Sequence, residues 1–184
     1  DNAGSPDDED GVTFPTLNLG KPADITVSVM NMFGADAKLT GFFDWNKDGD
    51  FLDANEMFFT TVANGFTGNI NLPITVPVTA LYNTDLGARF RLSTDAASVM
   101  IATGQSPNGE VEDYLVQVIA FDYGDLPDTG AGTGTANYQT AESDNGPVHQ
   151  IFDTIKIGNT IDGEGDGQQN GTATVDNNAT LDAE

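Results

Sequence analysis

Residues 44–56, with the sequence DWNKDGDFLDANE, contain the oxygen donors of a candidate calcium site. Alternate side chains supply oxygen in the first half of this segment, Gly49 permits a sharp turn, and two further carboxylates follow. A flexible loop of this kind can wrap a hard cation, because Ca²⁺ takes about six to eight oxygen ligands. The predicted ligands are Asp44, Asn46, Asp48, Asp50, Asp53 and Glu56. A polar surface turn is the alternative.

Only the first half of this loop matches an EF-hand pattern. The first, third, fifth and sixth positions agree, but Glu56 falls at the thirteenth position rather than the twelfth. The flanking residues 39–43 and 57–62 have the composition of strands, whereas the flanks of an EF-hand loop are helices. We therefore expect a calcium-binding connection between two strands, in which either Asp53 or Glu56 is the final ligand.

A second group of charged residues has the spacing of paired strands. Glu110 and Glu112 are two residues apart, which places both carboxylates on one face of a strand, with Asp113 on the other. Arg89 and Arg91 share a strand face in the same way. If the strands pair, we expect these arginines to form salt bridges with Glu110 and Glu112. The alternatives are a second calcium site that uses Glu110, Glu112 or Asp113, and a catalytic carboxylate pair.

Further candidate metal ligands lie toward both ends of the chain. They are Asp8 and Asp10, then Asp122, Asp125 and Asp128, and finally Asp162, Glu164 and Asp166. The aspartates at 122, 125 and 128 have turn capping as their alternative role. For the last group, in which acids alternate with glycines, the alternative is a solvated flexible loop.

The charge of the chain argues against nucleic acids and anionic membrane surfaces as partners. Its 29 acidic residues face only six Lys and Arg, which gives a formal net charge of −23. Phosphate binding requires clustered basic residues. The acids are 22 Asp and 7 Glu, a bias that favours turns and metal loops, with halophilic adaptation as the competing explanation. No apolar run is long enough to cross a bilayer, so membrane insertion is not expected.

The residues needed for most catalytic centres are scarce. The chain has no cysteine, and His149 is its only histidine. A thiolate metal site, a cysteine nucleophile and a histidine-rich zinc centre therefore cannot form within one chain. We expect a protein that is not an enzyme.

The hydrophobic pattern predicts an all-β protein. Residues 23–29, 89–93 and 114–119 alternate between apolar and polar, turn signals separate them, and no convincing helical stripe is present. We predict an antiparallel β-sandwich, immunoglobulin-like or jelly-roll-like, over residues 12–120. Residues 121–184 are rich in Gly and Asp and are predicted to form an irregular calcium-binding module, with a disordered linker as the alternative.

The segment Gly109–Tyr114, with the sequence GEVEDY, resembles the signature of the GEVED family. The loop at 44–56 and the strand at 88–93 accompany it in the expected order, so the resemblance covers residues 12 to about 120. Residues 121–128 are similar to the D-[FY]-G-D-x-P-D module found beside such domains, and residues 8–12 to the DEDGV segment that closes it. The family occurs in large secreted and surface-attached bacterial proteins, and the resemblance implies no enzymatic activity.

The order of these segments suggests a repeat. Residues 1–11 would complete the 121–184 module of this or a neighbouring subunit, as in a tandem array or a head-to-tail fibre. A fragment with a ragged boundary is the simpler alternative. We expect a calcium-stabilised structural repeat of an extracellular adhesin, matrix protein or fibre at the bacterial cell surface, whose partners are neighbouring copies of itself. The alternative is a carbohydrate-binding or accessory module of a secreted multidomain protein, with glycans as partners and Trp45 as a candidate stacking surface.

Overall fold

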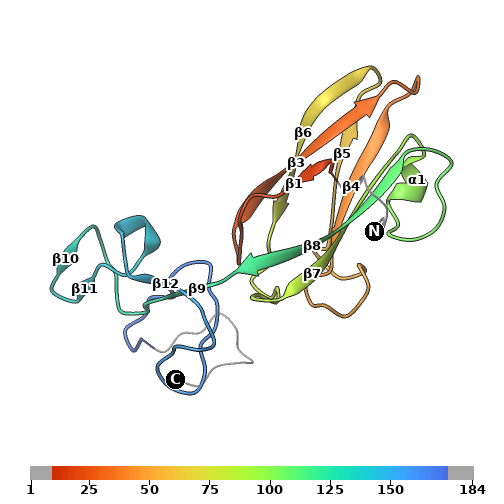
Figure 1. Ribbon diagram of the computed structural model, residues 1–184. Helices are drawn as coiled ribbons and strands as arrows, with labels where there is room; N and C mark the ends of the chain where they lie inside the picture. Colours follow the sequence, from red (N-terminus) through yellow and green to blue (C-terminus); the bar gives the residue numbers. More distant parts are fainter. Residues whose placement is uncertain (1–9, 174–184) are drawn as a thin grey trace.

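The computed structural model describes residues 10–173 and contains two facing β-sheets (Figure 1). The smaller sheet has the strand order β1-β3-β6, and the larger sheet has the order β2-β8-β7-β4-β5. Their bounds are Val12–Thr13 for β1, Leu17–Asn18 for β2, Pro22–Asn31 for β3, Ala37–Phe43 for β4, Met57–Val62 for β5, Phe66–Thr75 for β6, Asp85–Ser93 for β7 and Glu110–Ile119 for β8. The predicted all-β sandwich is confirmed.

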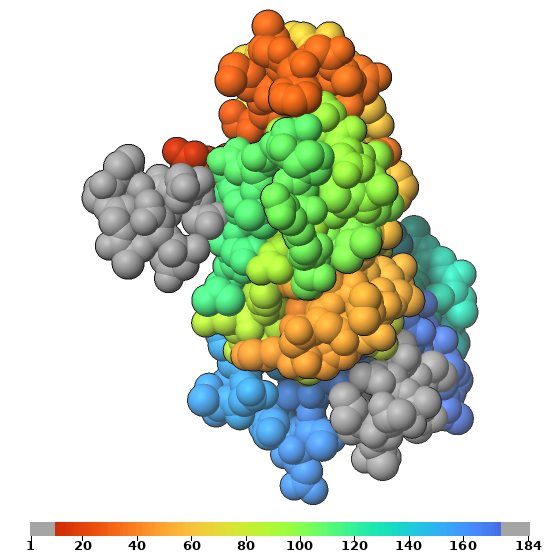
Figure 2. Space-filling model, turned by 90° about the vertical axis from the view of Figure 1, so that its right-hand side faces the viewer, coloured from red at the N-terminus to blue at the C-terminus, as the bar shows by residue number. Residues whose placement is uncertain are grey.

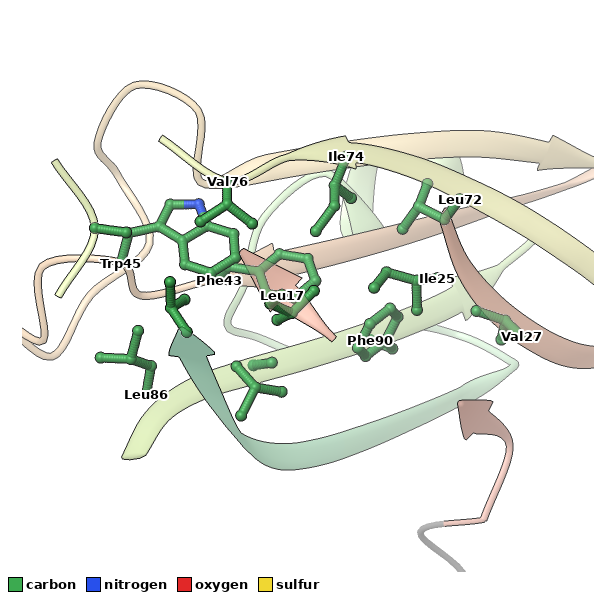
Figure 3. Close-up of a cluster of buried hydrophobic side chains, with 14 of the residues drawn as sticks. Leu17, Ile25, Val27, Phe43, Trp45, Leu72, Ile74, Val76, Leu86 and Phe90 are labelled. Carbon is green, nitrogen blue, oxygen red and sulfur yellow. The ribbon is translucent and has the colours of Figure 1, made fainter. Parts of the chain in front are cut away.

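Alternating apolar residues fill the space between the sheets. On β3, Ile25, Val27 and Val29 are buried, as their two-residue spacing predicts. The ring of Trp45 is buried and stacks on Phe43, with ring centroids 4.8 Å apart (Figure 3). Each fully buried side chain of this size contributes about 1.5–3 kcal/mol relative to an exposed one, so this shared core holds the two sheets together.

One strand pair departs from the antiparallel pattern. The chain leaves the smaller sheet after β1 and joins the larger sheet as β2, which pairs with β8 in parallel over two residues. The crossing includes Pro15, which has no backbone N–H to donate to a sheet. As a result, β1 and β2 each cover only a short part of a sheet edge.

Residues 121–173 form an irregular module at one end of the sandwich (Figure 1). Its regular elements are β9 (Phe121–Tyr123), β10 (Thr133–Gly134), β11 (Asn137–Tyr138), the 3₁₀ helix η1 (Glu142–Asp144) and β12 (Val148–Gln150). β9 continues directly from β8 and pairs with β12. The irregular structure that the composition predicts for this region is therefore present in residues 121–173.

The module packs against the sandwich through apolar and polar contacts. Ile151 is fully buried in the common core, and its backbone N–H donates to the carbonyl of Ala120 at 3.0 Å. A Cβ on Gly163 would come within 2.6 Å of Leu19, so only glycine fits at this close approach. Lys21 of the sandwich forms an ion pair with Glu142 of the module. Sandwich and module are thus joined by buried contacts and not only by the chain.

The helices in residues 10–173 are short. The only α-helix there, α1 (Ala96–Val99), lies in the connection between β7 and β8, and no helix within this range has the length and hydrophobicity of a membrane span. Residues 1–9 and 174–184, which include the candidate ligand Asp8, lie outside the described part of the chain.

Candidate metal centre

The candidate calcium loop closes one end of the β4–β5 hairpin. Phe42 and Met57 are opposite each other in the two strands, and the backbone N–H of Phe43 donates to the carbonyl of Glu56 at 2.9 Å. Asp44 and Glu56 therefore stand side by side where the strands end. The prediction that strands, and not helices, flank this loop is confirmed.

The alternating side-chain oxygens organise the backbone of the loop. The carboxylate of Asp44 accepts hydrogen bonds from the N–H groups of Asp48 and Gly49, both at 3.1 Å. Asn46, Asp48 and Asp50 each accept from the N–H two residues further along, at 2.9–3.1 Å. Gly49 has φ +93°, a conformation that glycine adopts without steric cost. Each of these side chains uses only part of its acceptor capacity in this way, so oxygen lone pairs remain for a cation.

Asn46 joins the two halves of the loop. Its amide nitrogen donates to Asp48 at 3.0 Å and to Asp53 at 2.6 Å. The positive end of the amide dipole thus lies between two carboxylates. Three of the predicted ligands are therefore brought together, in an arrangement that a cation between the carboxylates would also stabilise.

The strongest electrostatic feature of the loop is the buried carboxylate of Glu56. Its side chain is 1% exposed, and that of Asp44 beside it is 7% exposed. Burial is the main cause that raises the pKa of Glu56; N–H donors from Asp53 and Trp45 oppose the shift, and the charges of Asp44 and Asp53 add to it. Neither Asp44 nor Glu56 takes part in the two ion pairs found within residues 10–173, and Lys47 instead donates to Thr84 at 2.8 Å. Two buried carboxylates without a basic partner favour the binding of a cation.

This donor set fits calcium in its chemistry, but the donors do not yet converge. Across residues 10–173, no three Asp, Glu or His side chains are close enough together to hold a metal ion as they stand. Binding would therefore require the loop to close around the ion. Asp53 and Glu56 both remain candidates for the final ligand, Glu56 as a buried group and Asp53 as an exposed one.

The arginines on β7 have partners other than those we expected. The register of β7 and β8 places Arg89 opposite Asp113, and Arg89 holds that carboxylate through two hydrogen bonds of 2.7 and 2.6 Å. Directly opposite residues project from the same face, so the arginines are on the face opposite to Glu110 and Glu112. The predicted Arg–Glu ladder is wrong for this reason.

Arg91 has a structural role that the sequence did not reveal. Its guanidinium group is buried and donates to four backbone carbonyls in the connection that contains α1. These carbonyls belong to Ser98, Ile101, Thr103 and Gly104. No sequence motif marks this use of an arginine, since any residue can supply a carbonyl acceptor.

Glu112 contacts the start of the sandwich. It accepts a hydrogen bond of 2.6 Å from the hydroxyl of Tyr114, which in turn accepts from the N–H of Val12 at 3.2 Å. A Cβ on Gly11 would lie 2.9 Å from the Glu112 carboxylate, so this glycine permits the close approach. Glu110 and Asp10 are exposed. The GEVED strand and the residues around Gly11 are therefore in direct contact.

The module contains a second gathering of carboxylates, around Glu164. This side chain is buried where Glu164 bridges to Phe121. Burial is the main cause that raises its pKa to about 8, and the charges of Asp125, Asp162 and Asp122 add to the shift. Four predicted ligands are thus close enough together to influence one another.

Two other predicted ligands of the module cap turns. Asp128 accepts from the N–H groups of Thr140 at 2.8 Å and Ala141 at 2.9 Å, and these bonds lower its pKa. Asp166 accepts from the N–H groups of Glu142 at 2.9 Å and Gly167 at 2.8 Å. For these two residues the hydrogen bonds match the capping role that was the alternative to metal binding.

Comparison with known proteins identifies the domain. The family model described as the GEVED domain matches residues 38–117, from β4 to near the end of β8. The match includes the whole loop at 44–56 and the GEVED segment itself, and it ends before the acidic module begins. No curated protein matches the chain. Residues 38–117 therefore form a domain of the GEVED family.

Proposed function

We propose that this protein is a non-enzymatic, calcium-stabilised structural repeat of an extracellular bacterial adhesin, matrix protein or fibre. The observation that carries the proposal is the buried pair of carboxylates, Asp44 and Glu56, in the loop that joins β4 to β5 of a GEVED domain. A cation that neutralises this pair stabilises the folded chain directly. The carboxylates around Glu164 extend the same principle to the module.

Calcium acts on such a protein through mass action. Without the ion, the clustered carboxylates repel one another and the loops open more readily. Extracellular calcium modules bind with Kd values of about 0.1–1 mM. At a calcium concentration about 100 times Kd, one site adds about 2.7 kcal/mol to the free energy of unfolding. Calcium is abundant enough to fill sites of this affinity outside the cell, and the proposed location is therefore extracellular.

The position of Trp45 supports a structural role over a carbohydrate-binding role. The ring of Trp45 is buried in the core, so it does not offer a stacking surface to a glycan. His149, the only histidine, is exposed on β12. A structural repeat requires neither feature, and its partners in this proposal are neighbouring copies joined head to tail.

Thermal unfolding tests the proposal. We expect the melting temperature to rise when calcium at about ten times the upper end of that Kd range replaces a chelator. Magnesium at the same concentration should have a smaller effect, because it requires a stricter geometry. Glu56→Gln should reduce the calcium-dependent rise, whereas the matched control Asp24→Asn, at an exposed site on β3, should not. Identical melting temperatures in chelator and calcium would overturn the proposal.

A further inference from the structure

The two ends of the molecule carry exposed apolar side chains. At one end, the last residues of β3 and the turn that follows expose Met30, Met32 and Phe33, and Phe33 is 67% exposed; we call these residues the turn tip. At the other end, the segment after β12 exposes Phe152, Ile155 and Ile157, and Ile157 is 98% exposed; these residues are the module tip. Figure 2 shows the turn tip in orange at one end and the module tip in light blue at the other. Large contiguous apolar patches on a protein surface mark interaction sites, which makes these two tips the candidates.

The turn tip lies beside a hollow that can receive an apolar side chain. The hollow has a volume of about 280 Å³, and the turn-tip residues form part of its wall. Leu92, Thr94 and Asn108 line the other side. An exposed isoleucine on another molecule is of the right chemical kind to enter it.

The net charges of the two ends favour contact between a module tip and a turn tip over contact between two modules. Within residues 121–173 there are nine acids and one lysine, a net charge of −8. The segments around the hollow, residues 30–38 and 93–109, contain two acids and one lysine, a net charge of −1. Contact between two modules is therefore strongly repulsive, and contact between a module and a turn tip is much less so. Lys156 stands between the two isoleucines of the module tip, and Asp36 is exposed next to the turn tip, so this contact also brings opposite charges together.

The chain runs through the sandwich from the turn-tip end to the module end. β3 runs toward the turn tip and β1 is antiparallel to it, so the chain enters β1 from the turn-tip side. It leaves the sandwich from β8 into β9 at the opposite end (Figure 1). Copies stacked turn tip to module tip therefore keep one chain direction along the whole stack.

We infer that the module tip of one copy docks into the hollow beside the turn tip of the next copy, which makes this the contact between consecutive repeats. The two surfaces are different, so the contact is heterologous and does not close on itself; it generates an open linear assembly. This inference rests on the proposed function, whose head-to-tail arrangement it makes specific.

Disulfide trapping tests the contact directly, because the chain contains no cysteine of its own. In the chain with both Met32→Cys and Ile155→Cys, oxidation should produce a ladder of covalent oligomers. Each single variant should give dimers at most. The matched pair Leu115→Cys and Ile155→Cys, in which Leu115 is exposed on β8 away from both tips, should give no ladder. A ladder absent from the Met32 pair, or equal in both pairs, would overturn the inference.

A mixing experiment separates this contact from a symmetric one. Phe33→Asp disrupts one surface and Ile157→Asp the other, and each should weaken self-association at least tenfold, the effect of exposing one buried large apolar side chain. The variants are therefore compared at a concentration above the Kd of the natural chain and below the weakened Kd of each variant. Mixed together, the two variants should form dimers and nothing larger in sedimentation velocity, since each retains one intact surface. Self-dimers of either variant alone would contradict a heterologous contact. If calcium raises the melting temperature of these chains while they stay monomeric when mixed, the contact is wrong and the calcium proposal stands.

Discussion

The substitution Glu164→Gln should have opposite effects on stability in chelator and in calcium. Burial raises the pKa of Glu164 from 4.5 to about 8, and the charges of neighbouring carboxylates add to the shift. At pH 7 the folded chain therefore holds a proton on Glu164 that the unfolded chain releases. Each pH unit above the unfolded pKa costs about 1.4 kcal/mol, so this proton uptake destabilises the calcium-free protein by up to about 3 kcal/mol. Glutamine has no proton to take up and removes that cost.

In chelator at pH 7, we expect the variant to be more stable than the natural chain by up to about 3 kcal/mol in urea unfolding. Under the proposed function, calcium binds at Glu164 and neutralises the carboxylate of the natural chain, so the difference should shrink or reverse when calcium is added. The control Asp153→Asn, an exposed acid of the same module, should change stability by no more than about 0.5 kcal/mol in either condition.

The same substitution should alter the dependence of stability on pH. Between the unfolded pKa of 4.5 and the folded pKa of about 8, the folded natural chain binds more protons at Glu164 than the unfolded chain does. Its stability in chelator should therefore fall as pH rises through this window, by up to about 1.4 kcal/mol per pH unit relative to the variant. A variant that is less stable than the natural chain in chelator, with an unchanged pH slope, would refute the reasoning.

Three further substitutions test the frame around the candidate sites, each measured as the free energy of unfolding in urea. Gly109→Ala should destabilise the protein by several kcal/mol, because the new Cβ would lie 1.7 Å from a backbone carbonyl oxygen. The control Gly65→Ala is also at positive φ but has open space around it, so it should cost only about 1–2 kcal/mol. Equal losses of stability in the two variants would contradict this reasoning. Arg91→Lys should cost about 2–4 kcal/mol, because buried carbonyls lose their donor, and the more exposed Arg89→Lys no more than about 1 kcal/mol. Ile151→Ala should cost about 2–5 kcal/mol and speed proteolysis of the module; an unaffected module would show that it does not depend on this contact.

The strands were predictable because their signal is local. The alternation at residues 23–29 fixes which side chains of β3 face the core, and the composition on either side of the 44–56 loop predicts strands there. The order of donors in that loop is also a local pattern. These features depend on neighbours in the sequence, and the structure confirms the strands.

The partners across strands were not predictable. Whether Arg89 meets Asp113 or Glu112 depends on a register set by the whole β7–β8 pair, and a shift of one residue exchanges the two faces. The burial of Glu56 and Glu164 likewise depends on residues far away in the chain. In Glu164 the contact runs to β9, which begins more than 40 residues earlier. The raised pKa values of Glu56 and Glu164 therefore depend on the folded structure and could not be predicted from the sequence around each residue.

Hydrogen exchange across the 44–56 loop tests the central claim most directly. The backbone N–H groups of Asp48, Gly49 and Asp53 are bonded to side chains of the proposed ligands Asp44 and Glu56, so their exchange reports the opening of the loop. At calcium about 100 times Kd, exchange that requires release of the ion should slow about 100-fold relative to chelator. The amide of Gly65, in the β5–β6 turn, should change far less by local opening. Equal exchange rates of the three loop amides in calcium and chelator would contradict a calcium-stabilised loop.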